Sequence, residues 1–206
     1  LAQARRIRTE FSAKVRGTGE GQRMAGRTHA LDIIDALEWA LPDDATLIID
    51  GGSIGQWAHH LLTERRYPGF WLTCGRSGVV GYGLGAAMAA RLSRPDKAVV
   101  LLSGDGAFTF TVAELECAAR QGLPFVILLA DDQKWGITHS GHLRQFGSAM
   151  ASELGPIAFD ALARSLGAQG VRIEDRSEIG EVLQKAVKSR VLTLVHLPIS
   201  GGNPGL

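Results

Sequence analysis

Along most of the chain, short uninterrupted apolar runs alternate with segments whose apolar residues recur every three or four positions. The apolar runs predict strands at residues 46–50, 97–106, 123–132, 170–173 and 190–197. The helical spacing predicts helices at residues 28–41, 53–63, 81–92, 111–122, 157–169 and 176–189. Strands that are apolar throughout are typical of a parallel sheet with helices on both faces. We therefore expect an α/β fold, a three-layer sandwich around a mainly parallel sheet of about six strands.

The segments outside this pattern suggest how the chain is divided. Residues 1–27 are polar and only weakly periodic, so we expect a linker or a loose helix there, followed by one domain over residues 28–206. Residues 133–155 follow neither period and are expected to be irregular. Within the domain, Thr28 or Asp32 is expected to begin the first helix, and Gly122 to end the helix over residues 111–122.

Composition excludes several classes of protein. The chain has 206 residues, of which 45% are hydrophobic and 21% charged, as is ordinary for a globular domain. No apolar run is long enough to span a membrane, and the N-terminus lacks the apolar core of a signal peptide. A net charge of +1 argues against a nucleic-acid surface. Two cysteines, Cys74 and Cys117, are too few for a disulfide framework and indicate a cytoplasmic protein.

Three predicted strands end in glycine and aspartate, at Asp50-Gly51-Gly52, Gly104-Asp105-Gly106 and Asp131-Asp132. Ligands of open parallel sheets bind outside the carboxyl ends of the strands. The last two strands are joined by one helical crossover, which favours neighbouring positions in the sheet. Asp105 and Asp132 would then meet at one rim, where paired carboxylates suit Mg²⁺ together with a phosphate.

This arrangement resembles the cofactor-binding motif of the thiamine-diphosphate (ThDP) enzymes, in which Asn-Asn stands in the place of Asp131-Asp132. The resemblance covers roughly residues 28–200. It implies that Mg²⁺ is held by the side chains of Asp105 and Asp132 and by the main-chain carbonyl of Lys134. The aspartate at position 132 keeps an oxygen ligand but adds negative charge beside the diphosphate, which Mg²⁺ or Lys134 would offset.

The same resemblance implies further cofactor contacts. Val80 stands in a Gly-x-Met-Gly-like turn, at the position of the methionine that supports the bent cofactor. Ala107 stands where serine is frequent, so only its main chain can contribute, and Trp135 either stacks in the site or anchors its loop. The implied cofactor-binding residues are Gly52, Ser53, Ile54, Gly78, Val80, Gly104, Asp105, Gly106, Ala107, Asp132, Lys134 and Trp135.

The resemblance is to the C-terminal, diphosphate-binding domain of the acetolactate synthase and pyruvate decarboxylase-like enzymes. It implies a carboligase or carboxy-lyase acting on a 2-keto acid. In that family the activating glutamate lies on a separate pyrimidine-binding domain, so this chain alone is expected to be inactive and to hold no catalytic residue. Residues 1–27 would then lead from an upstream domain, and a homodimer or homotetramer is implied.

Two other interpretations remain open. Gly81-Tyr82-Gly83-Leu84-Gly85 approaches a dinucleotide-binding fingerprint, with Asp105 some 20 residues later, which would indicate a nicotinamide-dependent oxidoreductase. The departures at Val80, Ala107 and Asp131-Asp132 also allow a non-catalytic module with a decayed site. His139, His142 and Gln145 are candidates for substrate contacts, although the histidine pair lacks a third ligand for a metal site.

Overall fold

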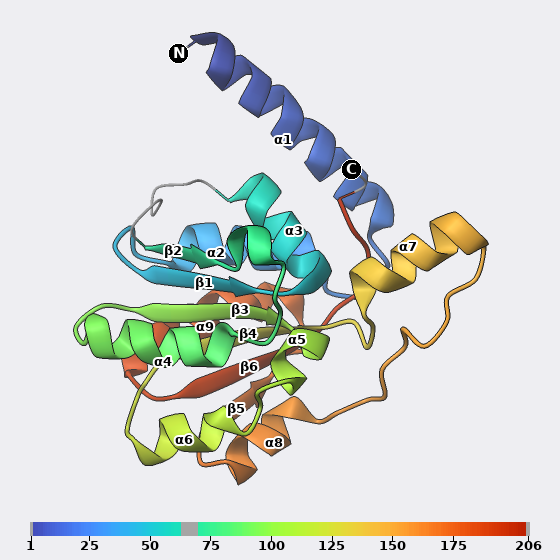
Figure 1. Cartoon of the computed structure of the whole chain (residues 1–206). Helices are drawn as coiled ribbons and strands as arrows, with labels where there is room; N and C mark the ends of the chain where they lie inside the picture. Colours follow the sequence, from blue (N-terminus) through green and yellow to red (C-terminus); the bar gives the residue numbers. More distant parts are fainter. Residues whose placement is uncertain (1, 63–69, 205–206) are drawn as a thin grey trace.

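The computed structural model describes residues 2–62 and 70–204, and it contains an α/β sandwich (Figure 1). Six strands of these residues form one sheet in the order β2-β1-β3-β4-β6-β5, and all of their pairings are parallel. The strands are β1 (Thr46–Asp50), β2 (Trp71–Thr73), β3 (Val99–Gly104), β4 (Val126–Asp131), β5 (Gln169–Arg172) and β6 (Thr193–Pro198). The predicted fold class is confirmed.

Helices cover both faces of the sheet, as Figure 1 shows. One layer contains α2 (Ala30–Ala40), α3 (Gly52–Leu61) and α9 (Ile179–Ser189). The opposite layer contains α4 (Gly83–Ser93), α5 (Asp105–Thr109), α6 (Glu114–Arg120) and α8 (Phe159–Ser165). The remaining helices are α1 (Ala2–Gln22) and α7 (Gly136–Phe146), and short 3₁₀ turns occur at Gly75–Ser77 and Arg176–Glu178.

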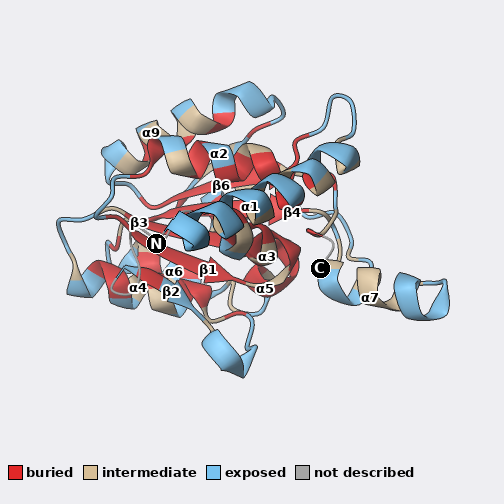
Figure 2. Cartoon of the chain, turned by 90° about the horizontal axis from the view of Figure 1, so that it is seen from above, coloured by how far each residue is buried: buried red, intermediate tan, exposed pale blue. Residues whose placement is uncertain are grey.

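The central strands are apolar because both of their faces are buried. Side chains alternate between the faces of a strand. Leu47 and Ile49 of β1 accordingly pack with α2 and α3, whereas Ile48 between them packs with α4. All five residues of β1 are buried, and so are all six of β4. Figure 2 shows the buried strands beneath helices whose outer surfaces are exposed.

Three helices or strands of the described residues were not predicted. The first is α5, which begins at Asp105 although the preceding strand was expected to continue to Gly106. Strand β2 has three residues at the edge of the sheet, and Leu72 and Thr73 are exposed, so no apolar run indicates it. The expectation of irregular structure over residues 133–155 was wrong for its first half, because α7 lies there. This helix has no buried residue and stands away from the body in Figure 1, which explains why its sequence lacks an apolar stripe.

The start of α2 also differs from the prediction. Its N-cap is His29, whose Nδ1 accepts a hydrogen bond from the backbone of Leu31 at 3.2 Å. Asp32 completes the cap from the other direction by accepting from the backbone N–H of His29 at 2.8 Å. Thr28 therefore lies one residue before the N-cap, and Asp32 is the second member of a capping box with His29. The predicted ending at Gly122 is confirmed by its φ of +64°, just after α6.

The first helix, α1, is a continuous helix of 21 residues that projects from the body at its N-terminal end (Figure 1). Its second half is attached to the domain, because Val15 is buried and Arg16 pairs with Asp35 of α2 at 2.8 Å. Its role as a linker stays a prediction. Within the described parts of the chain, no helix combines the length and apolar character that a membrane crossing requires.

Candidate functional site

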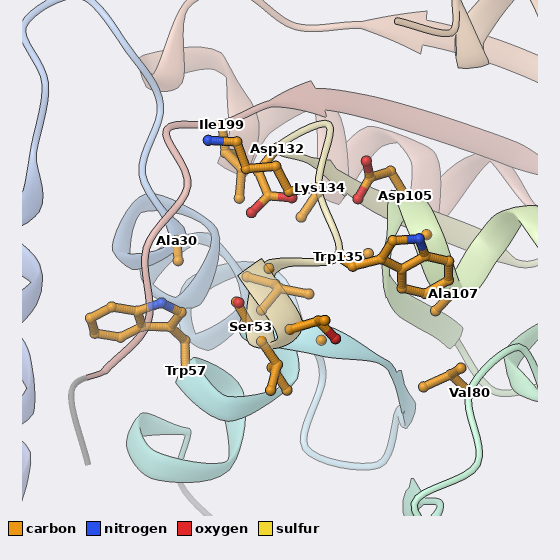
Figure 3. Close-up of a pocket in the computed structure, with 18 of the residues that line it drawn as sticks. Ala30, Ser53, Trp57, Val80, Asp105, Ala107, Asp132, Lys134, Trp135 and Ile199 are labelled. Carbon is orange, nitrogen blue, oxygen red and sulfur yellow. The ribbon is translucent and has the colours of Figure 1, made fainter. Parts of the chain in front are cut away.

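The carboxyl ends of three neighbouring strands open into one pocket. In the sheet register Asp50 lies beside Ser103, and Gly104 beside Ala130, so β1, β3 and β4 end at the same edge. A hollow of about 330 Å³ lies there, within the size range of small-molecule sites (Figure 3). The twelve residues predicted to bind the cofactor all line it: Gly52, Ser53, Ile54, Gly78, Val80, Gly104, Asp105, Gly106, Ala107, Asp132, Lys134 and Trp135.

Two carboxyl groups face one another across this hollow. Asp105 is only 4% exposed, and its side chain points toward that of Asp132 (Figure 3). Burial, followed by the negative charges of Asp132 and Asp131, raises the pKa of Asp105 to about 8. Burial also raises the pKa of Asp132, although a backbone hydrogen bond and the charge of Lys134 act in the opposite direction. A divalent cation between these groups would relieve their repulsion.

The turn after β4 is held in a defined shape. Asp131 begins it, and its Oδ1 accepts a hydrogen bond from the backbone of Gln133 at 3.1 Å. Gln133 adopts a left-handed conformation with φ of +56°. The next residues pair with a distant segment, because Trp135 donates to the carbonyl of Ser152 at 2.9 Å and Leu154 donates to that of Gln133 at 2.7 Å. The predicted ligand positions, Asp132 and Lys134, are therefore placed by a fixed backbone.

Two helices begin at the pocket. Ser53 lies in the first turn of α3, and its buried hydroxyl has no hydrogen-bond partner within the described part of the chain. Gly136 begins α7 so close by that an added Cβ would lie 2.5 Å from Ser53 Oγ and 3.1 Å from Asp132 Oδ2. Free backbone N–H groups at helix N-termini, together with a hydroxyl, form a favourable environment for phosphate.

Glycines allow the walls of the pocket to approach closely. A Cβ at Gly106 would lie 2.9 Å from the indole of Trp135, so the ring rests directly on this backbone. The same indole packs against Phe110 with ring centroids 5.5 Å apart. Trp135 therefore anchors the turn and lines the pocket at the same time. Val80 lies at the mouth and is 36% exposed.

Eight lining residues were not predicted: Ala30, Trp57, Ala130, Gly136, Ile137, Thr138, Ile199 and Gly202. Two of these residues, Ile199 and Gly202, belong to the segment after β6, which contacts α3 and the residues just before α2. Trp57 Nε1 donates to the carbonyl of Gly202 at 3.3 Å, and the backbone of Ser200 donates to that of Thr28 at 2.8 Å. The sequence contained one signal for these two residues: glycines follow the last apolar strand, which also ends at the ligand-binding edge.

The histidine candidates lie outside the pocket lining. His139 Nδ1 lies 3.2 Å from Ser152 Oγ, and His142 Nδ1 accepts from the backbone of Met150 at 3.4 Å. Gln145 is exposed on α7. Over residues 2–62 and 70–204, no group of three or more histidine, cysteine, aspartate or glutamate side chains is arranged to hold a metal. The predicted Mg²⁺ site needs only two carboxylates, together with a carbonyl.

The glycine-rich segment before α4 has an internal role. The carboxylate of Asp50 accepts hydrogen bonds from the backbones of Gly81 at 3.0 Å and Gly83 at 2.8 Å. A Cβ at Gly83 would lie 2.6 Å from Leu101 Cδ1, so this glycine allows α4 to pack on β3. A buried aspartate thus occupies the helix N-terminus where a dinucleotide would place its pyrophosphate.

Comparison with protein families agrees with this geometry. Residues 50–197 match the family model described as thiamine pyrophosphate enzyme, C-terminal TPP binding domain. The chain belongs to this family. The match begins at Asp50, the last residue of β1, and includes all of β3 and β4 with their carboxyl ends, so the thiamine pyrophosphate enzyme domain contains the whole predicted metal motif. The dinucleotide-binding interpretation is not favoured.

Relatives of this thiamine pyrophosphate domain are much longer proteins. The acetolactate synthase large subunit IlvG of Mycobacterium tuberculosis is 32% identical over 170 residues, which cover 82% of this chain and 31% of the relative. Human 2-hydroxyacyl-CoA lyase 2 is 32% identical over 165 residues, covering 79% and 26%. The chain thus spans about a third or less of these relatives.

A solved structure supports the same fold. The Rhodococcus jostii RHA1 thiamine diphosphate-dependent 4-hydroxybenzoylformate decarboxylase superposes with a TM-score of 0.78 at 22% identity. The match covers 87% of this chain and 34% of that one. This likeness confirms the architecture of a thiamine pyrophosphate enzyme domain.

Proposed function

We propose that this chain binds the diphosphate of ThDP through Mg²⁺ and forms half of the active site of a 2-keto-acid decarboxylase or carboligase. The Mg²⁺ ligands would be the side chains of Asp105 and Asp132 and the main-chain carbonyl of Lys134. The observation that carries the proposal is the convergence of Asp105, Asp132 and the unpartnered Ser53 hydroxyl on one pocket. Bound ThDP would supply the nucleophilic carbon that attacks the carbonyl of the keto acid.

The donor set fits this cofactor. Carboxylate and carbonyl oxygens are the ligands that Mg²⁺ prefers, and it commonly takes one or two carboxylates in addition to phosphate oxygens. Ser53 and the first turn of α3 offer hydrogen-bond donors close to Asp132. The apolar residues Ile54, Val80 and Trp135 would keep water from the less polar part of the cofactor.

The rest of the active site is proposed to come from a pyrimidine-binding domain, in the same polypeptide or in another chain. The length of the relatives supports this proposal, because they are about three times as long or longer. We further propose a homodimer or homotetramer and a cytoplasmic location, in keeping with the free thiols of Cys74 and Cys117. Acetolactate synthase and 2-hydroxyacyl-CoA lyase are names of relatives, and they favour carbon–carbon bond chemistry at a carbonyl group.

Calorimetric titration of ThDP into the longest polypeptide that contains this chain tests the proposal. We expect saturable binding with Mg²⁺, loss of binding in EDTA, and loss of binding in Asp105→Asn. NAD⁺ in a parallel titration should give no binding. If the complete assembly bound no ThDP with Mg²⁺, the site would be a decayed one and the proposed function would be wrong.

A further inference from the structure

A buried histidine contacts the metal-binding turn from outside the pocket. His196 of β6 is fully buried, and its Nε2 lies 2.8 Å from Asp131 Oδ2. Its Nδ1 faces Asp160 of α8 at 3.6 Å, beyond hydrogen-bond distance. Phe159 packs edge-on against the imidazole, with ring centroids 5.4 Å apart. The ring is therefore fixed between two carboxylates, on the side of the sheet opposite to α3.

Asp131 requires such a partner. Its side chain is 4% exposed and lies near two other carboxylates, Asp105 and Asp132. A buried carboxylate oxygen without a donor is strongly unfavourable, because it loses its hydration without compensation. His196 is placed to donate from Nε2 to this oxygen. A neutral amide at position 131 would cost much less to bury without that hydrogen bond.

Asp131 also fixes the shape of the turn that follows it. One carboxylate oxygen is held by His196, and the other accepts from the backbone of Gln133 at 3.1 Å. The carbonyl of Asp131 also accepts from the backbone of Ile199 at 2.9 Å. These contacts orient the peptide units immediately before Asp132, and Gln133 is held in its left-handed conformation.

We propose that His196 is a positioning residue for the metal site. By donating to Asp131, it fixes the turn that presents the side chain of Asp132 and the carbonyl of Lys134 to the cation. This inference rests on the proposed function, because it concerns these two groups as Mg²⁺ ligands. Partners that orient metal ligands from behind typically change metal affinity by one to two orders of magnitude.

A matched pair of variants separates hydrogen bonding from packing. The amide nitrogen of a glutamine reaches the position of Nε2, whereas that of an asparagine reaches only the position of Nδ1. In the complete polypeptide with ThDP, we expect His196→Gln to keep Mn²⁺ affinity within about threefold. His196→Asn should weaken it by about 10- to 100-fold. Mn²⁺ titration followed by electron paramagnetic resonance measures both, and an equal loss in the two variants would overturn the proposal.

A second substitution should restore the site. Asp131→Asn removes the charge that His196 compensates, so the double variant Asp131→Asn/His196→Asn should bind Mn²⁺ within about fivefold of Asp131→Asn alone. A purely structural role for the ring predicts no such rescue. A double variant that binds no better than His196→Asn therefore counts against positioning.

Failure of this inference differs from failure of the proposed function. If the wild-type protein takes up no Mn²⁺ with ThDP, the proposed function is wrong and this inference falls with it. If wild type and His196→Asn bind alike, only the positioning role is wrong.

Should His196→Asn not fold, ¹⁵N-histidine spectra of the wild type serve instead. They should show a slowly exchanging proton on Nε2 of His196 that shifts in Asp131→Asn, and a ring without this proton overturns the inference.

Discussion

Replacing Asp105 with asparagine should stabilise the metal-free protein while it removes cofactor binding. Burial and the charges of Asp132 and Asp131 raise the pKa of Asp105 from 3.8 to about 8. The folded chain therefore retains a proton that the unfolded chain releases. Stability should fall as pH rises from about 4 to about 8, and change little outside that window. The Asp105 side chain also hydrogen-bonds to that of Asp131, and an asparagine amide carries no charge and can still donate to Asp131.

The magnitude follows from the two pKa values. At pH 7 they imply a penalty of at most about 4 kcal/mol, since each pH unit above the unfolded pKa costs about 1.36 kcal/mol. Three carboxylates share this repulsion and the site can relax, so we expect Asp105→Asn to gain about 1–3 kcal/mol. For a chain of this length, that gain corresponds to a rise in Tm of about 2–12 °C.

Thermal unfolding in EDTA between pH 5 and pH 8 measures this effect. The Tm of the wild type should decline across the window, and that of Asp105→Asn should decline less. Asp96→Asn is the matched control, because its side chain is 89% exposed and should contribute within about 0.5 kcal/mol. A lower Tm for Asp105→Asn than for the wild type at pH 7.5 would refute the reasoning.

Three further substitutions test the walls of the pocket. Ser53→Ala removes an unpartnered hydroxyl, so stability should stay within about 1 kcal/mol while ThDP affinity falls about tenfold in calorimetry; unchanged affinity would remove Ser53 from the site. Gly106→Ala should displace the indole of Trp135, cost about 1–3 kcal/mol and alter tryptophan emission, so an unchanged spectrum would contradict the packing. Gly83→Ala should cost a similar amount through its contact with Leu101. Selective loss of NAD⁺ binding at normal stability would instead support the dinucleotide interpretation.

The sheet and its rim could be predicted because one physical constraint governs both. A parallel strand buried on both faces must be apolar throughout, so β3 and β4 stand out in the sequence. Their carboxyl ends then place Asp105 and Asp132 together without any knowledge of side-chain contacts. For the same reason, the residues predicted from the motif all line one pocket.

Most of the elements and contacts that were not predicted have no local sequence pattern that would indicate them. Strand β2 has only three residues, two of them exposed, and α7 buries no residue, so neither shows a periodic apolar pattern. Ile199 and Gly202 line the pocket because the chain returns to it after β6, and their only signal is indirect: glycines follow a strand that ends at the same edge. The contact between His196 and Asp131 joins positions 65 residues apart, and a histidine inside an apolar strand does not indicate its partner.

The long-range contacts of the segment after β6 relate the formation of the pocket to the folding of the domain. Gln22 Nε2 donates to the carbonyl of Asn203 across 181 positions, and Ser200 contacts Thr28 across 172. Contacts of such long range form slowly, because distant parts of the chain must first be brought together. During synthesis this wall emerges after the six strands of the described sheet. The pocket is therefore complete only when this segment has docked on the sheet, so we expect cofactor affinity to report that docking.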